Sequence, residues 1–209
     1  GDAAPCARRD ILLGVQSKGV DAARMALDIK TLSQNAHWTS LPVGVVTLAE
    51  RFKEIENERQ RFDAMCDYTK SLIAPFAATG AGATEDRLLR MQLLGTSGTV
   101  TTLAGVHLDL PRYNRSMVDG LWMRQLDLST LIDDLLTMDH ARRSLIPCIG
   151  DDRSELVISG ASILSAILHY WPTEKLRVAD RGLREGLLYG LMNREDALQR
   201  DAHRAAGAP

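Results

Sequence analysis

Two glycines bracket a pair of hydroxyl residues in the segment LLGTSGTVTTLAG, Leu93 to Gly105. The apolar residues before it predict a strand, and those after it predict a helix. Glycines at such a turn let backbone N–H groups approach an anion, and the helix N-terminus adds partial positive charge. The same pattern also occurs as a routine connection in α/β proteins, so its spacing alone leaves both interpretations open. The candidate phosphate-binding residues are Gly95, Thr96, Ser97, Gly98 and Thr99.

A second polar segment, VADRGLREG, runs from Val178 to Gly186 and follows another apolar run. Open α/β sheets bind ligands at the carboxyl ends of their strands, so its two arginines and two acids could recognise a phosphate or a nucleotide. The alternative, which the residues alone favour, is that Asp180 or Arg181 caps the next helix and pairs locally.

Arg153 lies in a third segment of interest, IPCIGDDRSELVISGASIL, Ile146 to Leu164. Asp151 or Asp152 is expected to cap the long helix that follows. A cation in the first turn opposes the helix dipole. Arg153 is therefore expected to have an anionic partner, either one of these aspartates or a ligand.

Strands and helices must alternate to position these segments. Strands are predicted at 25–29, 38–46, 88–94 and 175–179. Helices are predicted at 47–78, 101–110, 119–139 (with Ser129 or Thr130 as its cap), 153–171 and 186–192, and residues 11–17 are expected to end a helix. This order predicts an α/β layer fold with a mostly parallel sheet.

The composition is that of an ordinary globular protein: 209 residues, 45% hydrophobic and 25% charged, with a formal net charge of -2. This charge balance does not favour nucleic acid or an anionic membrane as a partner. No apolar run approaches the roughly 18 residues that a membrane span needs. The three cysteines lack metal-site spacing. Because the first residues do not have the pattern of a signal peptide, the sequence predicts a cytoplasmic protein.

Taken together, the segments resemble the Ppx/GppA phosphatase family, which belongs to the actin-like ATPase superfamily. Their order is that of the family, over about residues 25 to 192, and the match is best with short bacterial members that lack an added nucleotide-hydrolase-like domain. The matching segments are WTSLPVGVVTLAERF (38–52), LLGTSGTVTTLAGVHLDLPRYNRSMVDG (93–120), IPCIGDDRSELVISGASIL (146–164) and LRVADRGLREGLLYGLM (176–192).

The resemblance implies two actin-like domains with an active-site cleft between them, and this chain corresponds to the second. The expected fold is an α/β, ribonuclease H-like domain, with a mixed sheet flanked by helices and a helical insertion. Residues 1–20 would be a linking segment that follows the first domain, 21–195 the second actin-like domain, and 196–209 a flexible tail.

The resemblance also implies a reaction. The family hydrolyses the terminal phosphoanhydride of inorganic polyphosphate, or the 5′-γ-phosphate of guanosine pentaphosphate, with Mg²⁺. Gly95 to Thr99 match a phosphate-facing loop, Arg153 sits where relatives place a basic residue near the polyanion, and Asp28 matches a metal-associated aspartate. Residues 182–186 match the family's closing loop and are interpreted as structural. The general base is a glutamate of the first domain, so no catalytic residue is assigned here.

Two departures from the family pattern bear on activity. Asp28-Ile29 should continue as GGGSTE but continues as KTLSQN, and the first domain should precede residue 1. We therefore expect a phosphoanhydride hydrolase at the family level whose 209 residues are inactive alone. The alternative is a degenerate, non-catalytic phosphate-binding or interaction module, and half of an actin-like sugar kinase is a weaker third. An exposed apolar domain face would allow a homodimer.

Overall fold

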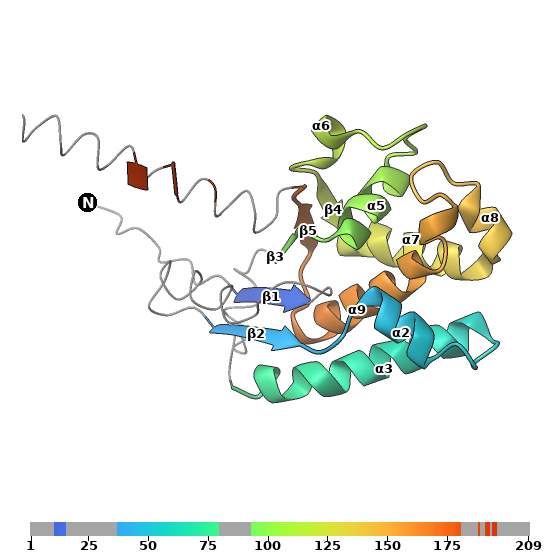
Figure 1. Cartoon of the computed structure of the whole chain (residues 1–209), viewed down its shortest axis with the longest axis horizontal. Coiled ribbons are helices and arrows are strands. Elements are labelled where there is room, and N and C mark those ends of the chain that lie inside the picture. Colours follow the sequence, from blue (N-terminus) through green and yellow to red (C-terminus); the bar gives the residue numbers. More distant parts are fainter. Residues whose placement is uncertain are drawn as a thin grey trace, which may run out of the picture.

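The computed structural model describes residues 11–15, 37–79 and 93–180, together with 188, 191, 192, 194 and 195 (Figure 1). The predicted strand at 25–29, the metal-associated Asp28, the 182–186 loop and the tail lie outside the described residues. The division into residues 1–20, 21–195 and 196–209 stays a prediction.

Strands β1 (Ile11–Val15) and β2 (His37–Leu41) pair in parallel, with Ile11 opposite His37. The prediction that residues 11–17 end a helix is wrong, because the apolar run Ile11–Val15 is a strand of this pair. Strand β2 ends five residues before the predicted boundary. Pro42 follows it, and proline cannot donate a ladder hydrogen bond.

The second sheet has three strands in the order β3-β5-β4, with bounds Leu93–Gly95, Lys175–Val178 and Trp122–Arg124 respectively. β3 and β5 are parallel, with Gly95 beside Val178, and β4 is antiparallel to β5. The sheet is therefore mixed, as the resemblance implies. The parallel pair brings the beginnings of the two predicted polar segments, at Gly95 and Val178, to one edge of the sheet.

Helices α2 (Val45–Arg51) and α3 (Glu58–Ala77) replace the single helix predicted over 47–78. The break occurs at Asn57, whose side chain accepts a hydrogen bond from the Gln60 amide at 3.0 Å and so caps α3. Asparagine is favoured at an N-cap because its side-chain oxygen can accept a hydrogen bond from a backbone N–H of the first helical turn.

The remaining helices are α5 (Gly98–His107), α6 (Arg115–Val118), α7 (Gln125–Thr137), α8 (His140–Ser144) and α9 (Leu156–Tyr170), with a 3₁₀ turn, η1, at Asp151–Arg153. Between α5 and α9, α6 to α8 form the predicted helical insertion.

Two helices begin at other residues than the sequence predicts. The helix predicted from 119 is preceded by β4, and Ser129 and Thr130 lie inside α7, donating to the Gln125 and Leu126 carbonyls rather than capping it. The helix predicted from Arg153 begins at Leu156. Asp151 and Asp152 belong to η1 and do not cap α9, whose N-cap Glu155 makes no side-chain capping bond.

Helix α9 is the centre of the core. Figure 1 shows it between α2 and α3 on one side and α5 and α7 on the other, and it contacts all four. It is buried along most of its length, from Val157 to Leu168. Gly160, which has no side chain, lets α5 come close to it. In the described part of the chain, no helix is long and apolar enough to cross a membrane.

Cys66 lies at the contact between α3 and α9, where its thiol faces the Ser162 carbonyl at 3.5 Å. Burial raises the pKa of the Cys66 thiol from 9.0 to about 12, although the nearby charge of Lys70 lowers this pKa in part. The unfolded chain therefore loses this proton at a lower pH than the folded protein. The contribution of the protonated Cys66 thiol to stability is complete below pH 9.0 and is lost as the pH rises towards 12.

We predict that the free energy of unfolding falls by about 1 kcal/mol between pH ~8.5 and ~10 on account of Cys66, since one proton is worth roughly 1.4 kcal/mol per pH unit. Urea denaturation at both pH values would show this fall in the native protein. In Cys66→Ala the baseline stability is lower, but this part of the pH dependence is absent. Equal slopes in the two proteins would contradict the assignment.

Candidate phosphate-binding site

The predicted phosphate loop is the connection from β3 to α5. The helix begins at Gly98, three residues earlier than predicted, so the loop includes the first helical turn. Ser97 is the N-cap, and its Oγ accepts a hydrogen bond from the Val100 amide at 3.3 Å. Thr101 donates the first intrahelical backbone bond to the Ser97 carbonyl, so the N–H groups of Gly98 and Thr99 precede the helical ladder. This turn can bind an anion through N–H groups and a partial positive charge.

The two glycines of the loop have different roles. A Cβ at Gly95 would lie 2.8 Å from the Val100 Cγ1, so this glycine allows α5 to pack closely on the end of β3. A Cβ at Gly98 would have no atom within 4 Å. Thr96, Ser97 and Gly98 are exposed, which leaves the backbone of the turn open to a ligand from outside.

Thr99 faces the core side of the turn. Its Oγ1 lies 2.0 Å from the point that a Cβ on Gly160 of α9 would occupy. The side chain is half-buried there, so Thr99 fixes the helix N-terminus against α9 and contributes its backbone N–H to the exposed turn. Its assignment as a phosphate-binding residue stays a prediction.

Arg153 approaches the same helix one turn further along. Its Nη1 donates to the Thr102 Oγ1 on α5 at 3.2 Å, and the Arg153 residue is exposed. Within the part of the chain that the structure describes, no salt bridge joins it to Asp151 or Asp152, the protein partners proposed from the sequence. Among the described residues, the guanidinium is thus bonded to a neutral hydroxyl, and its charge is available for an anion.

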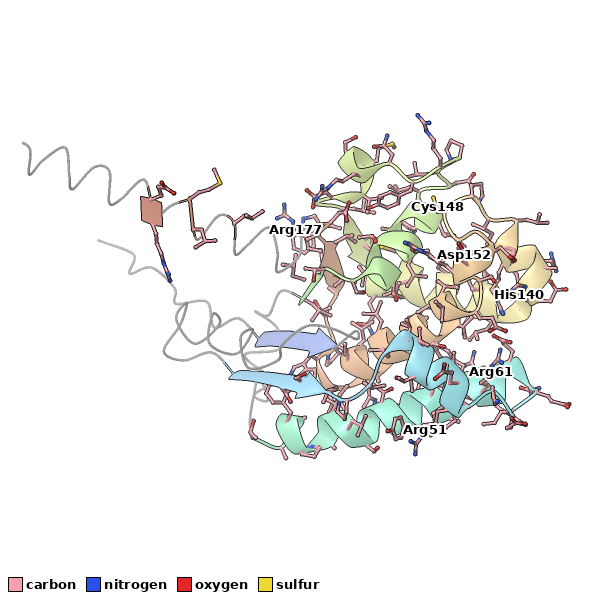
Figure 2. The ribbon with its side chains drawn as sticks, viewed as in Figure 1. Arg51, Arg61, His140, Cys148, Asp152 and Arg177 are labelled. Carbon is pink, nitrogen blue, oxygen red and sulfur yellow. The ribbon has the colours of Figure 1, made fainter. Side chains whose placement is uncertain are left out.

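The turn η1 that carries Arg153 is held by α8. The buried Ser154 donates its hydroxyl to the Asp151 carbonyl at 2.9 Å, and its Oγ lies 2.6 Å from His140 Nε2. Ser144 donates to the Asp151 carboxylate at 3.1 Å. Asp152 lies between α5 and α8 in the view of Figure 2. The hydrogen bonds of Ser154 and Ser144 fix the backbone from which Arg153 reaches α5.

A second cluster forms at the end of β5, beside the phosphate loop. The Ala179 amide donates to the Gly95 carbonyl at 2.8 Å, which places Asp180 next to the end of β3. Arg115 Nε lies 3.2 Å from the Asp180 carboxylate and Arg115 Nη2 donates to the Asp180 carbonyl. The Asp180 amide donates to Asp119 Oδ1 at 2.9 Å.

The structure does not show the local pairing of Asp180 that the sequence favours, because its described partners are Arg115 and Asp119, 65 and 61 residues earlier in the chain. The start of the helix that Asp180 or Arg181 was expected to cap lies outside the described residues. The sequence alone did not indicate Arg115 or Asp119 as site residues. Their only local signal is Asn114, which caps the short helix α6, because its side chain accepts from the Ser116 amide at 3.1 Å.

In the described ranges, no group of three or more histidine, cysteine, aspartate or glutamate side chains could hold a metal ion. Magnesium commonly needs only one or two carboxylates when phosphate oxygens and water complete its shell. The described residues thus do not form a metal site made of protein ligands alone.

The described residues thus combine a mixed sheet, packed helices and a hydroxyl-rich turn at a helix N-terminus. Comparison with models of known protein families matches residues 28–195 to the Ppx/GppA phosphatase family. This span covers most of the chain, and the chain belongs to that family.

Solved structures agree on the fold. A crystal structure of the Aquifex aeolicus Ppx/GppA family member has a TM-score of 0.62 and 22% identity, covering 74% of this chain and 48% of that one. An exopolyphosphatase from Cytophaga hutchinsonii has a TM-score of 0.60 and 20% identity, covering 72% and 48%. The chain thus spans about half the length of these structures.

A curated relative also matches. The Haemophilus influenzae protein named "Putative exopolyphosphatase" is 30% identical over 99 residues, which is 47% of this chain and 29% of that protein. The chain is therefore similar to a limited part of this relative.

The contact between Thr99 and Gly160 gives a test of how the site is positioned. We predict that Gly160→Ala destabilises the protein, because the clash with Thr99 costs about 1–3 kcal/mol, more than the roughly 1 kcal/mol that alanine gains in helix propensity. Chemical denaturation would measure the loss. Gly98→Ala, which meets no atom within 4 Å, is the matched control and should not be destabilised by a clash. A Gly160→Ala protein as stable as the native one would contradict the close approach.

Proposed function

We propose that this chain supplies the phosphate-binding half of a phosphoanhydride hydrolase of the exopolyphosphatase or guanosine pentaphosphate phosphatase type. The substrate would lose its terminal phosphate, from inorganic polyphosphate or from guanosine pentaphosphate. The observation that carries the proposal is the exposed turn Thr96 to Gly98 at the start of α5, with Arg153 bonded to the second turn of the same helix. A cytoplasmic location and a homodimer stay predictions from the sequence.

The proposed chemistry is phosphoryl transfer to water, in which the protein positions the phosphates and neutralises their charge. The backbone N–H groups of Gly98 and Thr99 would donate to phosphate oxygens, and the exposed Thr96 and Ser97 hydroxyls could add further donors. Arg153 would neutralise charge on a neighbouring phosphate. Mg²⁺, with Asp28 as its proposed protein ligand, would lower the negative charge of the phosphate chain when bound.

A non-catalytic role for the isolated chain has its own support. Asp28-Ile29 is followed by KTLSQN, which has neither glycines nor an acid, where the family pattern has GGGSTE. The proposal therefore includes that the 209 residues bind a phosphate chain without hydrolysing it, and that the general base comes from outside this sequence.

Binding tests the site directly. Tripolyphosphate titrated into the protein by calorimetry is expected to bind, and Arg153→Gln should lower its affinity by about tenfold, the equivalent of roughly 1.4 kcal/mol for a lost charge-assisted bond. Arg59→Gln is the matched control, since it also removes one exposed arginine charge, which pairs with Asp133 on α7 at 2.7 Å. Equal losses in both variants would show a nonspecific charge effect, and no binding by the native protein would overturn the proposed site.

A turnover assay tests whether this chain binds the phosphate chain without hydrolysing it. Release of inorganic phosphate from long-chain polyphosphate and from guanosine pentaphosphate, measured with Mg²⁺, should be undetectable for the 209-residue chain. Sustained release that scales with protein concentration would contradict the proposal that the general base lies outside it. The phosphate-binding assignment would then be tested by the same assay with Arg153→Gln.

A further inference from the structure

The first residue of α8 contacts the turn η1 that carries Arg153. His140 Nε2 lies 2.6 Å from Ser154 Oγ, and Ser154 directly follows Arg153 in the chain. Figure 2 labels His140 on α8 and Asp152 on η1, two elements that are in contact. The histidine and the serine are 14 residues apart in sequence, so their contact joins two separate elements of the fold.

Ser154 is fully buried, and its hydroxyl has two neighbours within hydrogen-bond distance. The first is His140 Nε2, and the second is the Asp151 carbonyl, 2.9 Å from Ser154 Oγ. The same carbonyl accepts from the Ser154 amide at 3.3 Å. The hydroxyl and the amide of Ser154 therefore both close η1 onto its first residue. Removing a partner from this buried hydroxyl would weaken the turn, because a buried polar group keeps the cost of its desolvation.

The single proton of the Ser154 hydroxyl determines the direction of both bonds. A serine hydroxyl donates one hydrogen bond and accepts others through its lone pairs. If it donates to the Asp151 carbonyl, it must accept from His140, and the ring must carry a proton on Nε2. A neutral ring protonated only on Nδ1 could only accept at Nε2, and Ser154 would then give up its bond to Asp151. Both contacts are hydrogen bonds only with a proton on Nε2, and they then run from the imidazole to the hydroxyl to the carbonyl.

These two bonds enclose Arg153, which lies between Asp151 and Ser154 in sequence. Its guanidinium donates to Thr102 Oγ1 on α5 at 3.2 Å. Thr102 is buried and Arg153 is exposed, so the guanidinium meets this hydroxyl at the surface of the protein. A long side chain binds in one place only if the backbone that carries it is held, since small displacements of a supporting residue loosen a site.

We propose that His140 is a positioning residue for the phosphate site: it donates from Nε2 to Ser154, and this bond holds η1 in the conformation from which Arg153 reaches α5. The inference rests on the proposed function, in which Arg153 neutralises charge on a phosphate. His140 acts without touching the phosphate chain, through the backbone of η1 and the Arg153 guanidinium.

The position of the ring proton is observable in the native protein. Nitrogen–proton correlation NMR spectra of the histidine rings, recorded above the pH at which the His140 ring loses its charge, distinguish a proton on Nε2 from one on Nδ1. We expect the Nε2–H form of His140, and we expect Ser154→Ala to raise the fraction of the Nδ1–H form, because the acceptor at Nε2 is gone. A native ring in the Nδ1–H form, or a ratio of forms that Ser154→Ala leaves unchanged, would overturn the inference.

Two substitutions of His140 test the donor. Glutamine keeps an N–H donor on the side chain, and leucine keeps an apolar side chain without a donor. We expect His140→Leu to lower the affinity for tripolyphosphate, measured by calorimetry, about threefold to tenfold, as for the loss of one hydrogen bond, and His140→Gln to stay within about twofold of the native protein. The donor role is refuted if His140→Leu binds as tightly as the native protein, or if His140→Gln loses as much affinity as His140→Leu.

Ser154→Ala removes the other partner of the bond and should lower the affinity to a similar extent. Ser162→Ala is the matched control, because Ser162 is also fully buried and also donates its hydroxyl to the carbonyl three residues earlier, at 2.7 Å, but within α9. We expect the control to lose comparable thermal stability and to keep its affinity. Equal losses of affinity in the two serine variants would show general destabilisation and refute the inference. If Ser154→Ala does not fold, His140→Leu decides the question.

A double substitution tests whether His140 acts through Arg153. In an Arg153→Gln background there is no guanidinium to position, so His140→Leu should lower the affinity by less than about twofold. The same loss in both backgrounds would show that His140 affects binding by another route and would overturn the inference.

The failure of this inference can be told apart from the failure of the proposed function. If the native protein does not bind tripolyphosphate, the proposed function fails and the inference with it. If Arg153→Gln weakens binding while His140→Leu binds as tightly as the native protein, the proposed function stands and the role of His140 is refuted.

Discussion

The close contact between α5 and α9 is the constraint on which the site depends. Gly160 has no side chain, and the Thr99 hydroxyl occupies the space that a Cβ would take. This lets the first turn of α5 rest directly on the most buried helix of the protein. An anion-binding turn gains from such support, because its N–H groups act together only if the turn keeps one conformation. The same helix is preceded by η1, so the backbone that supports Thr99 also leads to Arg153.

Among the described residues, a buried arginine lies on α8, the helix that contacts η1. Arg143 is 1% exposed and donates to the Leu135 and Met138 carbonyls at 3.2 and 2.7 Å, which satisfies carbonyl groups at the end of α7. Its guanidinium also lies 3.2 Å from Glu58 at the start of α3. A buried arginine with such partners ties helix ends together, and removing one partner is costly because the charge stays behind. This pairing orders the α3, α7 and α8 junction, from which α8 in turn holds η1.

Much of the fold could be predicted from the sequence, because local patterns dictate it. The apolar run that ends at Gly95 and the helix after it follow from periodicity and glycine position, as does β5. Other elements were missed for physical reasons. The short strand β4 is formed by pairing with β5, a contact across 55 residues of sequence at Trp122 and Arg177 that no local pattern shows. The start of α3 did have a local signal, since Asn57 followed three residues later by Gln60 is a helix N-cap pattern.

The residues of the candidate site also fall into those that the sequence predicts and those that it does not. The glycines and hydroxyl residues of the loop are contiguous, so one sequence sufficed to find them, and Arg153 was found from its conflict with a helix dipole. The partners of Asp180 could not be found, because Arg115 and Asp119 come from a connection whose path depends on the whole sheet. Charge and polarity identified Asp180 as a residue that needs a partner, but only the fold determines which one.

The glycine at position 160 also limits how the phosphate turn could be reused. The segment from β3 to α5 looks self-contained, since its glycines, cap and hydroxyls lie within a dozen residues. Its geometry nevertheless depends on a helix that begins some fifty residues later in the chain. A peptide of this segment, or a graft of it onto another α/β scaffold, would retain the sequence motif and lose the surface that shapes it. The portable unit is the turn together with α9.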